Sequence, residues 1–297
     1  MPDHQQTPTQ AKEPRAESLW LDAGRRLRRQ PLSIFAAIVV LVLIFTAIFG
    51  PMLAPYDPNN IDMNSRFDAP SLAHPFGADD LGRDILSRIM VGARISLQVG
   101  LIAVGLSATV GTLLGLVGGY AGRITDEIIM RAMDILFAFP AILLAIAIMA
   151  ALGKGITNAM IAIGIVYVPI FARIARSSVL AIREEEFIEA ARATGSSDMR
   201  IMFRHILPNI LSPLIVETTL SLSFAILAEA ALSFFGLGTQ PPDPSWGRML
   251  SEGRAYFNQS PWLGIWPGLA IMMTVMGFNL LGDGLRDALD PRLKNVR

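Results

Sequence analysis

Six long apolar runs, separated by polar and charged segments, divide the chain. The hydrocarbon core of a bilayer is about 30 Å thick and is crossed by about 20 residues in helical form. Backbone polar groups find no water there, so each crossing segment must be a helix. We therefore predict six transmembrane helices. They are Ser33–Leu53, Ile95–Tyr120, Ile135–Leu152, Ile156–Phe171, Ile210–Phe235 and Trp262–Leu281.

Composition agrees with a membrane protein and excludes several other classes. Apolar residues make up 52% of the chain and charged residues only 17%, whereas soluble domains carry about 25% charged residues. The net charge is zero, which gives no basis for nucleic-acid binding. Cysteine is absent, which excludes disulfides and thiol catalysis, and the three histidines lie far apart in the sequence. We expect no catalytic residue, no metal site and no cofactor.

The distribution of Lys and Arg predicts the orientation of the chain. Cytoplasmic loops of inner-membrane proteins carry an excess of these residues. If the N-terminus is inside, the inner segments hold most of the 25 Lys and Arg residues, beginning with the cluster Arg25–Arg29 directly before the first run. An even number of spans returns the C-terminus to the same side. We therefore predict a multi-pass protein of a bacterial inner membrane with both termini in the cytoplasm.

Polar segments outside the runs complete the predicted organisation. The start of the chain lacks apolar periodicity and is predicted to be partly disordered. Asp80–Gly92 places apolar residues on one helical face, with Asp79 or Asp80 as its N-cap, which predicts a short helix along the membrane interface. The predicted divisions are a cytoplasmic tail (1–30), a first transmembrane helix (31–53), a periplasmic segment (54–94), a five-helix core (95–285) and a cytoplasmic C-terminal tail (286–297).

The charged inner segment 177–208, between the fourth and fifth runs, has the pattern of two short helices joined by a turn. Glu184–Thr194 is rich in helix formers, and Gly195 follows it as a C-cap that accepts a left-handed backbone without a Cβ clash. A second helix with an apolar face follows the turn and is predicted to end at Pro208. Such a hairpin fits either docking into a groove of another protein or resting on the membrane surface. Physical reasoning alone leaves both open.

This segment resembles the EAA loop of ABC importer permeases. Glu189-Ala190-Ala191, Gly195 and Ile206-Leu207-Pro208 have the spacing of that loop, on the predicted side and between the predicted spans. The likeness is to the dipeptide/oligopeptide branch, to the second of its paired permease subunits, and extends from about Pro31 to Pro291. Further matching stretches are His74–Asp84, Met133–Pro140, Ala228–Gly238 and Asn279–Pro291, with Ala78 where the family pattern has Thr or Val.

The resemblance implies an all-α membrane protein with six transmembrane helices, the type I ABC importer permease fold, and a cytoplasmic coupling helix between spans four and five. It implies as partners a sister permease in a heterodimer, two cytoplasmic ATPase subunits, a periplasmic substrate-binding protein and membrane lipid. The joint with the ATPase would consist of Glu189, Ala190, Ala191, Gly195 and Pro208. Glu189 would supply charge and a hydrogen-bond acceptor, and Gly195 the sharp reversal. The implied cargo is a dipeptide or oligopeptide, with glutathione or nickel as alternatives.

The ATP used by such a transporter would bind to partner chains, because this chain has no P-loop. A P-loop around the one Gly-Lys pair, Gly153-Lys154, would need Gly at position 148 and Ser or Thr at position 155. The chain has Ile148 and Gly155 there. We therefore predict a transport subunit that is not itself an enzyme. An ion-coupled secondary carrier is the alternative class, although it would need no charged docking hairpin.

Glycine and proline carry further signals inside the runs. Gly111, Gly115 and Gly119 recur every four residues in the second run, a spacing that lets helix backbones approach closely. They would pack against another helix of the chain or against the sister permease. Pro169 and Pro213 lie in the fourth and fifth runs, where each marks either a hinge or a static kink.

Two carboxylates interrupt the fifth run, Glu217 and Glu229. An intramembrane carboxylate usually faces a water-filled path or pairs with a partner group. The two are separated by about 120° of helical rotation, so they do not share a face. We predict both as candidates for the lining of a translocation path, with structural pairing as the alternative for each.

Overall fold

The computed structural model describes residues 24–25, 27 and 30–289 of the 297-residue chain. Within them every regular element is a helix, and one isolated antiparallel bridge joins Ala78 to Asp84. The predicted all-α fold class is confirmed. The predicted disorder near the N-terminus, most of the cluster Arg25–Arg29 and the end of the C-terminal tail lie outside the described residues.

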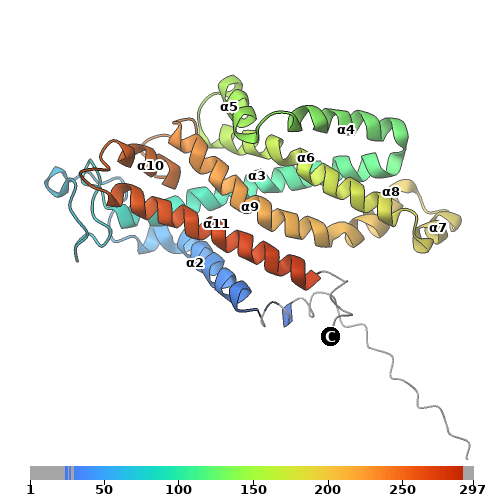
Figure 1. The fold of residues 1–297 in the computed structure, drawn as a ribbon, viewed down its shortest axis with the longest axis horizontal. Coiled ribbons are helices and arrows are strands. Elements are labelled where there is room, and N and C mark those ends of the chain that lie inside the picture. The colour runs from blue at the N-terminus through green and yellow to red at the C-terminus, as the bar shows by residue number, and fades with distance from the viewer. Residues whose placement is uncertain (1–23, 26, 28–29, 290–297) are drawn as a thin grey trace, which may run out of the picture.

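The long helices lie side by side along one axis (Figure 1). The first half of the chain forms α2 (Pro31–Leu53), the short 3-10 helix η1 (Met63–Ser65), α3 (Ile85–Ala121), α4 (Arg123–Phe137), α5 (Ala141–Leu152) and α6 (Ile156–Ile182). The second half forms α7 (Glu186–Ala193), α8 (Asp198–Arg200), the π-helical turn η2 (Ile201–Ile206), the 3-10 turn η3 (Leu207–Ile210), α9 (Leu211–Phe234), α10 (Trp246–Arg254) and α11 (Trp262–Leu289). Helices α7 and α8 lie at one end of the bundle, and α10 lies at the opposite end.

Five helical segments of the described chain are long and apolar enough to cross a membrane, or six if α4 and α5 count as one broken span. The third predicted span is therefore not one straight helix, because α4 and α5 meet at 93°. Pro140 has no N–H and disfavours helical backbone at Phe139, so the helix stops there. With 12 residues, α5 is about 18 Å long and does not cross a bilayer alone.

The predicted interfacial helix Asp80–Gly92 is wrong in both its start and its independence. Its residues from Ile85 onward form the first turns of α3, which continues without a break to Ala121. The N-cap is Asp84, whose side chain accepts the Ser87 N–H at 2.8 Å. Asp79 instead accepts the N–H groups of Leu81 and Arg83, in the turn that precedes α3. The amphipathic stretch is thus the end of a membrane-spanning helix.

The helices next to the predicted coupling segment are also longer than their apolar runs. Helix α6 continues past the predicted end at Phe171 to Ile182. Pro208 does not end a helix, because the chain passes through η2 and η3 into α9 with helical backbone, and Asp198–Phe234 forms one segment long enough to span. The wider π-helical turn before Pro208 accommodates the missing donor and the ring of the proline.

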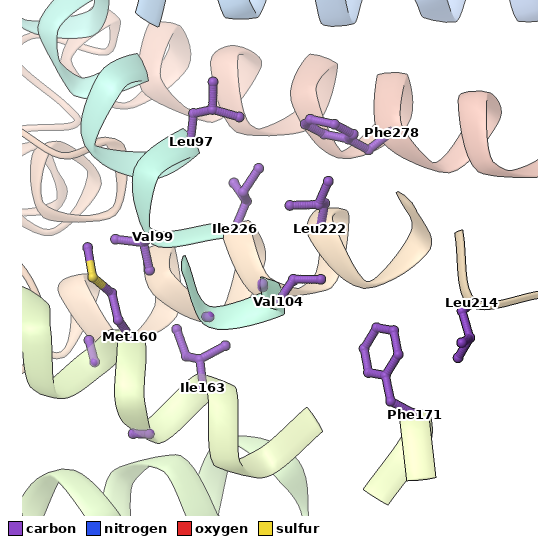
Figure 2. Close-up of a cluster of buried hydrophobic side chains, with 14 of the residues drawn as sticks. Leu97, Val99, Val104, Met160, Ile163, Phe171, Leu214, Leu222, Ile226 and Phe278 are labelled. Carbon is purple, nitrogen blue, oxygen red and sulfur yellow. The ribbon is translucent and has the colours of Figure 1, made fainter. Parts of the chain in front are cut away.

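The core of the bundle lies between α3, α6 and α9. Figure 2 shows side chains from these helices, among them Val104, Ile163 and Ile226, meeting in one buried cluster. Close approach of α3 and α6 depends on glycine. A Cβ at Gly111 would lie 2.6 Å from Cβ of Phe171, and one at Gly119 would lie 2.9 Å from Cβ of Val179. Gly115 likewise faces α6, with Ala175 Cβ at 2.7 Å. The three glycines thus pack against a helix of the same chain.

Candidate functional site

A helix–turn–helix unit, here called the elbow (residues 184–208), stands at the end of the bundle away from α10 (Figure 1). The turn that reverses it is centred on Gly195, whose φ is +80°. The Gly195 N–H donates to the Arg192 carbonyl at 3.0 Å, and the Ser196 N–H donates to the Ala191 carbonyl at 3.1 Å. This pair of bonds is a Schellman motif, which glycine terminates at no steric cost.

One side of helix α7 in the elbow is buried against the rest of the chain, and the opposite side is exposed. Ile188 is fully buried and Ala191 is 9% exposed, where α7 packs against η2. Glu189 and Ala190, on the opposite side of α7, are exposed, and Pro208 is exposed beyond η2.

Three large apolar side chains of the elbow also point outward. Phe187 and Phe203 are each 43% exposed, and Met199 is 62% exposed. Apolar side chains beside an exposed carboxylate are typical of a surface that docks into a partner's groove.

The elbow is tied to the end of α3. The Tyr120 hydroxyl donates to Asp198 Oδ1 at 2.7 Å, and Arg183 Nη1 donates to the Gly119 carbonyl at 3.0 Å. The Arg192 guanidinium lies 5.7 Å from the centroid of the Tyr120 ring. Asp198 and Arg192 thus join both helices of the elbow to the C-terminal end of α3.

Glu229 lies inside the chain and is 1% exposed. Its carboxylate accepts the Ser96 hydroxyl at 3.2 Å and the Ser233 hydroxyl at 2.7 Å. Ser233 Oγ in turn accepts the Thr239 N–H at 3.1 Å, which fixes the chain after α9. This geometry favours the structural-pairing alternative for Glu229, because its oxygens are enclosed between α3 and α9.

Glu217 lies on a different face of α9 and is half-buried. Its one hydrogen bond among the described residues comes from the Ser221 hydroxyl at 2.9 Å, one turn further along the same helix. The same face continues to Phe224, which borders a cavity between α5, α6 and α9. Of the two predicted path residues, Glu217 is the more exposed, and it shares its face of α9 with Phe224, which lines the cavity.

Family profiles match most of the chain. The profile described as the binding-protein-dependent transport system inner membrane component matches residues 111–295. The profile of the N-terminal transmembrane domain of oligopeptide transport permease C matches residues 18–75. The chain belongs to the ABC importer permease family.

Curated relatives of the permease agree over nearly its whole length. It is 51% identical over 280 residues to the dipeptide transport system permease protein DppC of Alkalihalophilus pseudofirmus, covering 94% of this chain and 92% of the relative. It is 50% identical over 276 residues to the glutathione transport system permease protein GsiD of Escherichia coli, covering 93% and 91%. A multi-pass inner-membrane permease follows from this membership.

A solved structure confirms the fold of the permease. The inward-facing MetNI methionine ABC transporter matches with a TM-score of 0.56 at 19% identity, over 68% of this chain and 96% of the other. At this identity the likeness concerns the fold alone.

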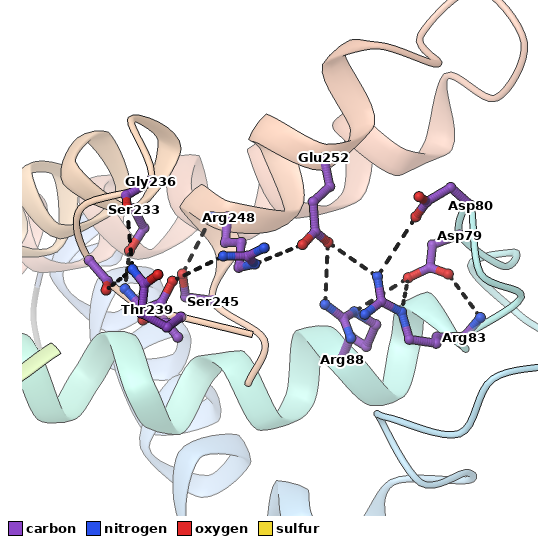
Figure 3. Close-up of polar contacts among 12 residues, drawn as sticks. Asp79, Asp80, Arg83, Arg88, Ser233, Gly236, Thr239, Ser245, Arg248 and Glu252 are labelled. Carbon is purple, nitrogen blue, oxygen red and sulfur yellow. Dashed lines mark hydrogen bonds and ion pairs between the residues drawn. The ribbon is translucent and has the colours of Figure 1, made fainter. Parts of the chain in front are cut away.

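The end of the permease opposite the elbow holds an ionic network that the sequence did not reveal (Figure 3). Glu252 of α10 lies 2.7 Å from Arg248 Nε, 3.3 Å from Arg83 Nη2 and 3.5 Å from Arg88 Nη2. Arg83 Nε also donates to Asp79 Oδ2 at 2.6 Å. The network fastens the segment before α3 to α10.

Asp80 lies at the edge of this network, 3.7 Å from Arg83 Nη2. Burial, reinforced by the negative charge of Asp79, raises the pKa of the Asp80 carboxyl above its ordinary value of 3.8. The only signal in the sequence was the density of charge in Asp79–Arg88. Glu252, which pairs with Arg83 and Arg88 of this segment, is far away in the sequence, so the pairing was not predictable.

Proposed function

We propose that the permease is the second of two permease subunits in an importer of peptide-like substrates. In this proposal it forms a heterodimer with a sister permease. Two cytoplasmic ATPase subunits drive the transport, and a periplasmic binding protein delivers the substrate. The names of the relatives support a dipeptide or glutathione as cargo.

The elbow is the observation that carries the proposal. Its exposed Glu189 and Ala190, beside the outward-facing Phe187, make a surface with both charge and apolar area. That surface suits docking into a groove on an ATPase subunit. The excess of Lys and Arg on the same side supports a cytoplasmic elbow and cytoplasmic termini.

Helix continuity supports a mechanism in which the elbow transmits movement. Helix α6 joins α7 through residues 183–185, and after the turn at Gly195 the backbone runs from α8 through η2 and η3 into α9 without an extended break. In this proposal a push on α7 is passed to α6 and α9, two of the helices that border the cavity lined by Phe224. Closure of the ATPase dimer would then switch the cavity between the two permeases from inward-facing to outward-facing.

Two cargo alternatives deserve a direct comparison. The dipeptide and glutathione relatives are 51% and 50% identical, so identity does not separate them, and nickel is an alternative from the family resemblance alone. Both peptide cargoes carry a free amino group and carboxylates. Family membership argues against the ion-coupled secondary carrier, which would work without ATP.

Uptake in a strain that lacks this permease tests the proposal. Labelled dipeptide, glutathione and nickel are supplied in turn, and the gene is returned as wild type, Glu189→Ala or Glu184→Ala. Glu184 is the control because its side chain is exposed and, within the part of the chain that the structure describes, forms an ion pair only with its neighbour Arg183. We expect wild type and Glu184→Ala to restore peptide uptake and Glu189→Ala to restore little. Failure of the wild-type gene to restore either peptide cargo would contradict the proposal.

A further inference from the structure

One face of α9 carries residues that the rest of the described chain leaves partly or largely uncovered. Glu217, Phe224 and Ala231 are separated by seven residues each, which places them on the same side of an α-helix. Phe224 and Leu227 are 51% and 47% exposed. Glu217 is the one charged side chain on this otherwise apolar stripe of α9.

The C-terminal half of this stripe, from Phe224 to Ala231, borders a cavity of about 210 Å³ between α5, α6 and α9. Its walls are almost entirely apolar, and the one hydroxyl group in the lining belongs to Tyr167. Lining side chains include Ile142, Ile163, Tyr167, Phe224, Leu227 and Ala231. Glu217 lies seven residues from Phe224, or about 10 Å along α9, on the side of the elbow.

Glu217 has no cation of its own. Among residues 30–289 no Lys, Arg or His forms an ion pair with it, and its one hydrogen bond is from Ser221. On α6, Arg173 instead lies 2.8 Å from Asp134 and 4.3 Å from the centroid of the Phe137 ring.

A carboxylate held at membrane depth without a cation is costly unless water or a partner reaches it. An ionised Glu217 therefore requires water, a substrate group or a group of another subunit beside it.

We infer that Glu217 and the adjoining cavity form one half of a cargo subsite. The carboxylate binds the primary ammonium group of a peptide-like substrate, and the apolar cavity receives a neighbouring side chain of that substrate. The inference rests on the proposed function and adds the chemical class that this chain recognises. A pairing of Glu217 with a cation of the sister permease is the competing outcome.

The absence of native cysteine allows a direct test on the assembled transporter in nanodiscs. Phe224→Cys introduces a thiol on the stripe, and its labelling rate is measured with a trimethylammonium and a sulfonate methanethiosulfonate reagent. At about 10 Å from a carboxylate in a partly aqueous site, the ratio of cationic to anionic rate should fall about five-fold when Glu217→Gln is added. Glu217→Asp should preserve the ratio.

Two further variants serve as controls. Leu41→Cys on α2, where the side chain is 63% exposed on an apolar helix, should resist both reagents because it faces lipid. Glu184→Gln in the elbow should leave the ratio at Phe224→Cys unchanged.

Substrate protection separates an ammonium subsite from a general negative potential. Alanyl-alanine should slow the labelling of Phe224→Cys, and N-acetyl-alanyl-alanine, which lacks the ammonium group, should not. Glu217→Gln should abolish the difference between the two peptides. Equal protection by both peptides, an unchanged rate ratio, or a Phe224→Cys that neither reagent reaches would overturn the inference. Uptake that requires this permease, together with any of those results, would leave the proposed function intact.

Discussion

Gly195 allows the geometry of the elbow to be tested without changing its chemistry. Its φ of +80° lies in the left-handed region, and a Cβ added there would meet no atom within 4 Å. Gly195→Ala therefore introduces a backbone penalty and no clash. Gly195→Pro requires a φ near −65° and removes the N–H that donates to the Arg192 carbonyl.

The expected free-energy cost of the turn differs between Gly195→Asn, Gly195→Ala and Gly195→Pro. An ordinary L-residue in left-handed conformation costs about 1–2 kcal/mol, and asparagine tolerates it better. A cost of that size lowers the ratio of native to alternative turn about 5–30-fold. Proline is incompatible with the native turn altogether. We expect transport in the order Gly, Asn, Ala and Pro, with Asn near wild type and Pro inactive.

Uptake of labelled dipeptide and ATP hydrolysis by the reconstituted transporter measure this series together. An immunoblot of the membrane fraction controls for the amount of permease. Loss of uptake with normal permease levels is the expected result for Gly195→Pro. Wild-type uptake by Gly195→Pro would refute the role given to the elbow, whatever the other variants do.

Three other substitutions test the packing and the charges, each by thermal unfolding of the solubilised transporter. Glu229→Ala strands the hydroxyls of Ser96 and Ser233 in a buried site and should cost about 2–4 kcal/mol, whereas Glu229→Gln should cost less; equal losses would contradict this. Gly115→Leu should destabilise by about 1–3 kcal/mol or more because α6 leaves no room, and an unchanged midpoint would contradict it. Because burial raises the pKa of Asp80, the folded state holds that proton more tightly, so the contribution of Asp80 to stability should fall as pH rises from 3.8 through the raised pKa. Asp80→Asn should weaken this fall, and an identical pH profile would count against it.

Apolar patterning located the five helices that are long and apolar enough to cross a membrane, and it predicted where two of them begin. Helices α6 and α11 start at Ile156 and Trp262, the predicted residues. Both continue beyond their predicted ends, to Ile182 and Leu289. Apolarity marks the part of a helix inside the bilayer, whereas helical backbone continues through charged residues beyond it.

Local breaks were harder to predict than spans. Pro140 divides the third span, but Pro208 does not end the helix before α9, because a π-helical turn absorbs it. The effect of a proline depends on whether the neighbouring turn widens, which the sequence pattern does not encode.

The candidate site was predictable only where it is local. The Gly195 turn follows from a glycine after a run of helix formers, and the structure has it. The rotation between Glu217 and Glu229 was also predictable, but which face α3 covers was not. That depends on Ser96, which is distant in sequence from the carboxylate that it contacts.

Crosslinking from the elbow tests the central claim most directly. Ala190→Cys places a single, exposed thiol on α7 of a chain that has no other cysteine. In membranes that contain the whole transporter, we predict that a thiol-reactive benzophenone attached at this position photo-crosslinks to an ATPase subunit and that ATP changes the yield. A thiol that is labelled only from the periplasmic side, or that joins no ATPase subunit, would contradict the account.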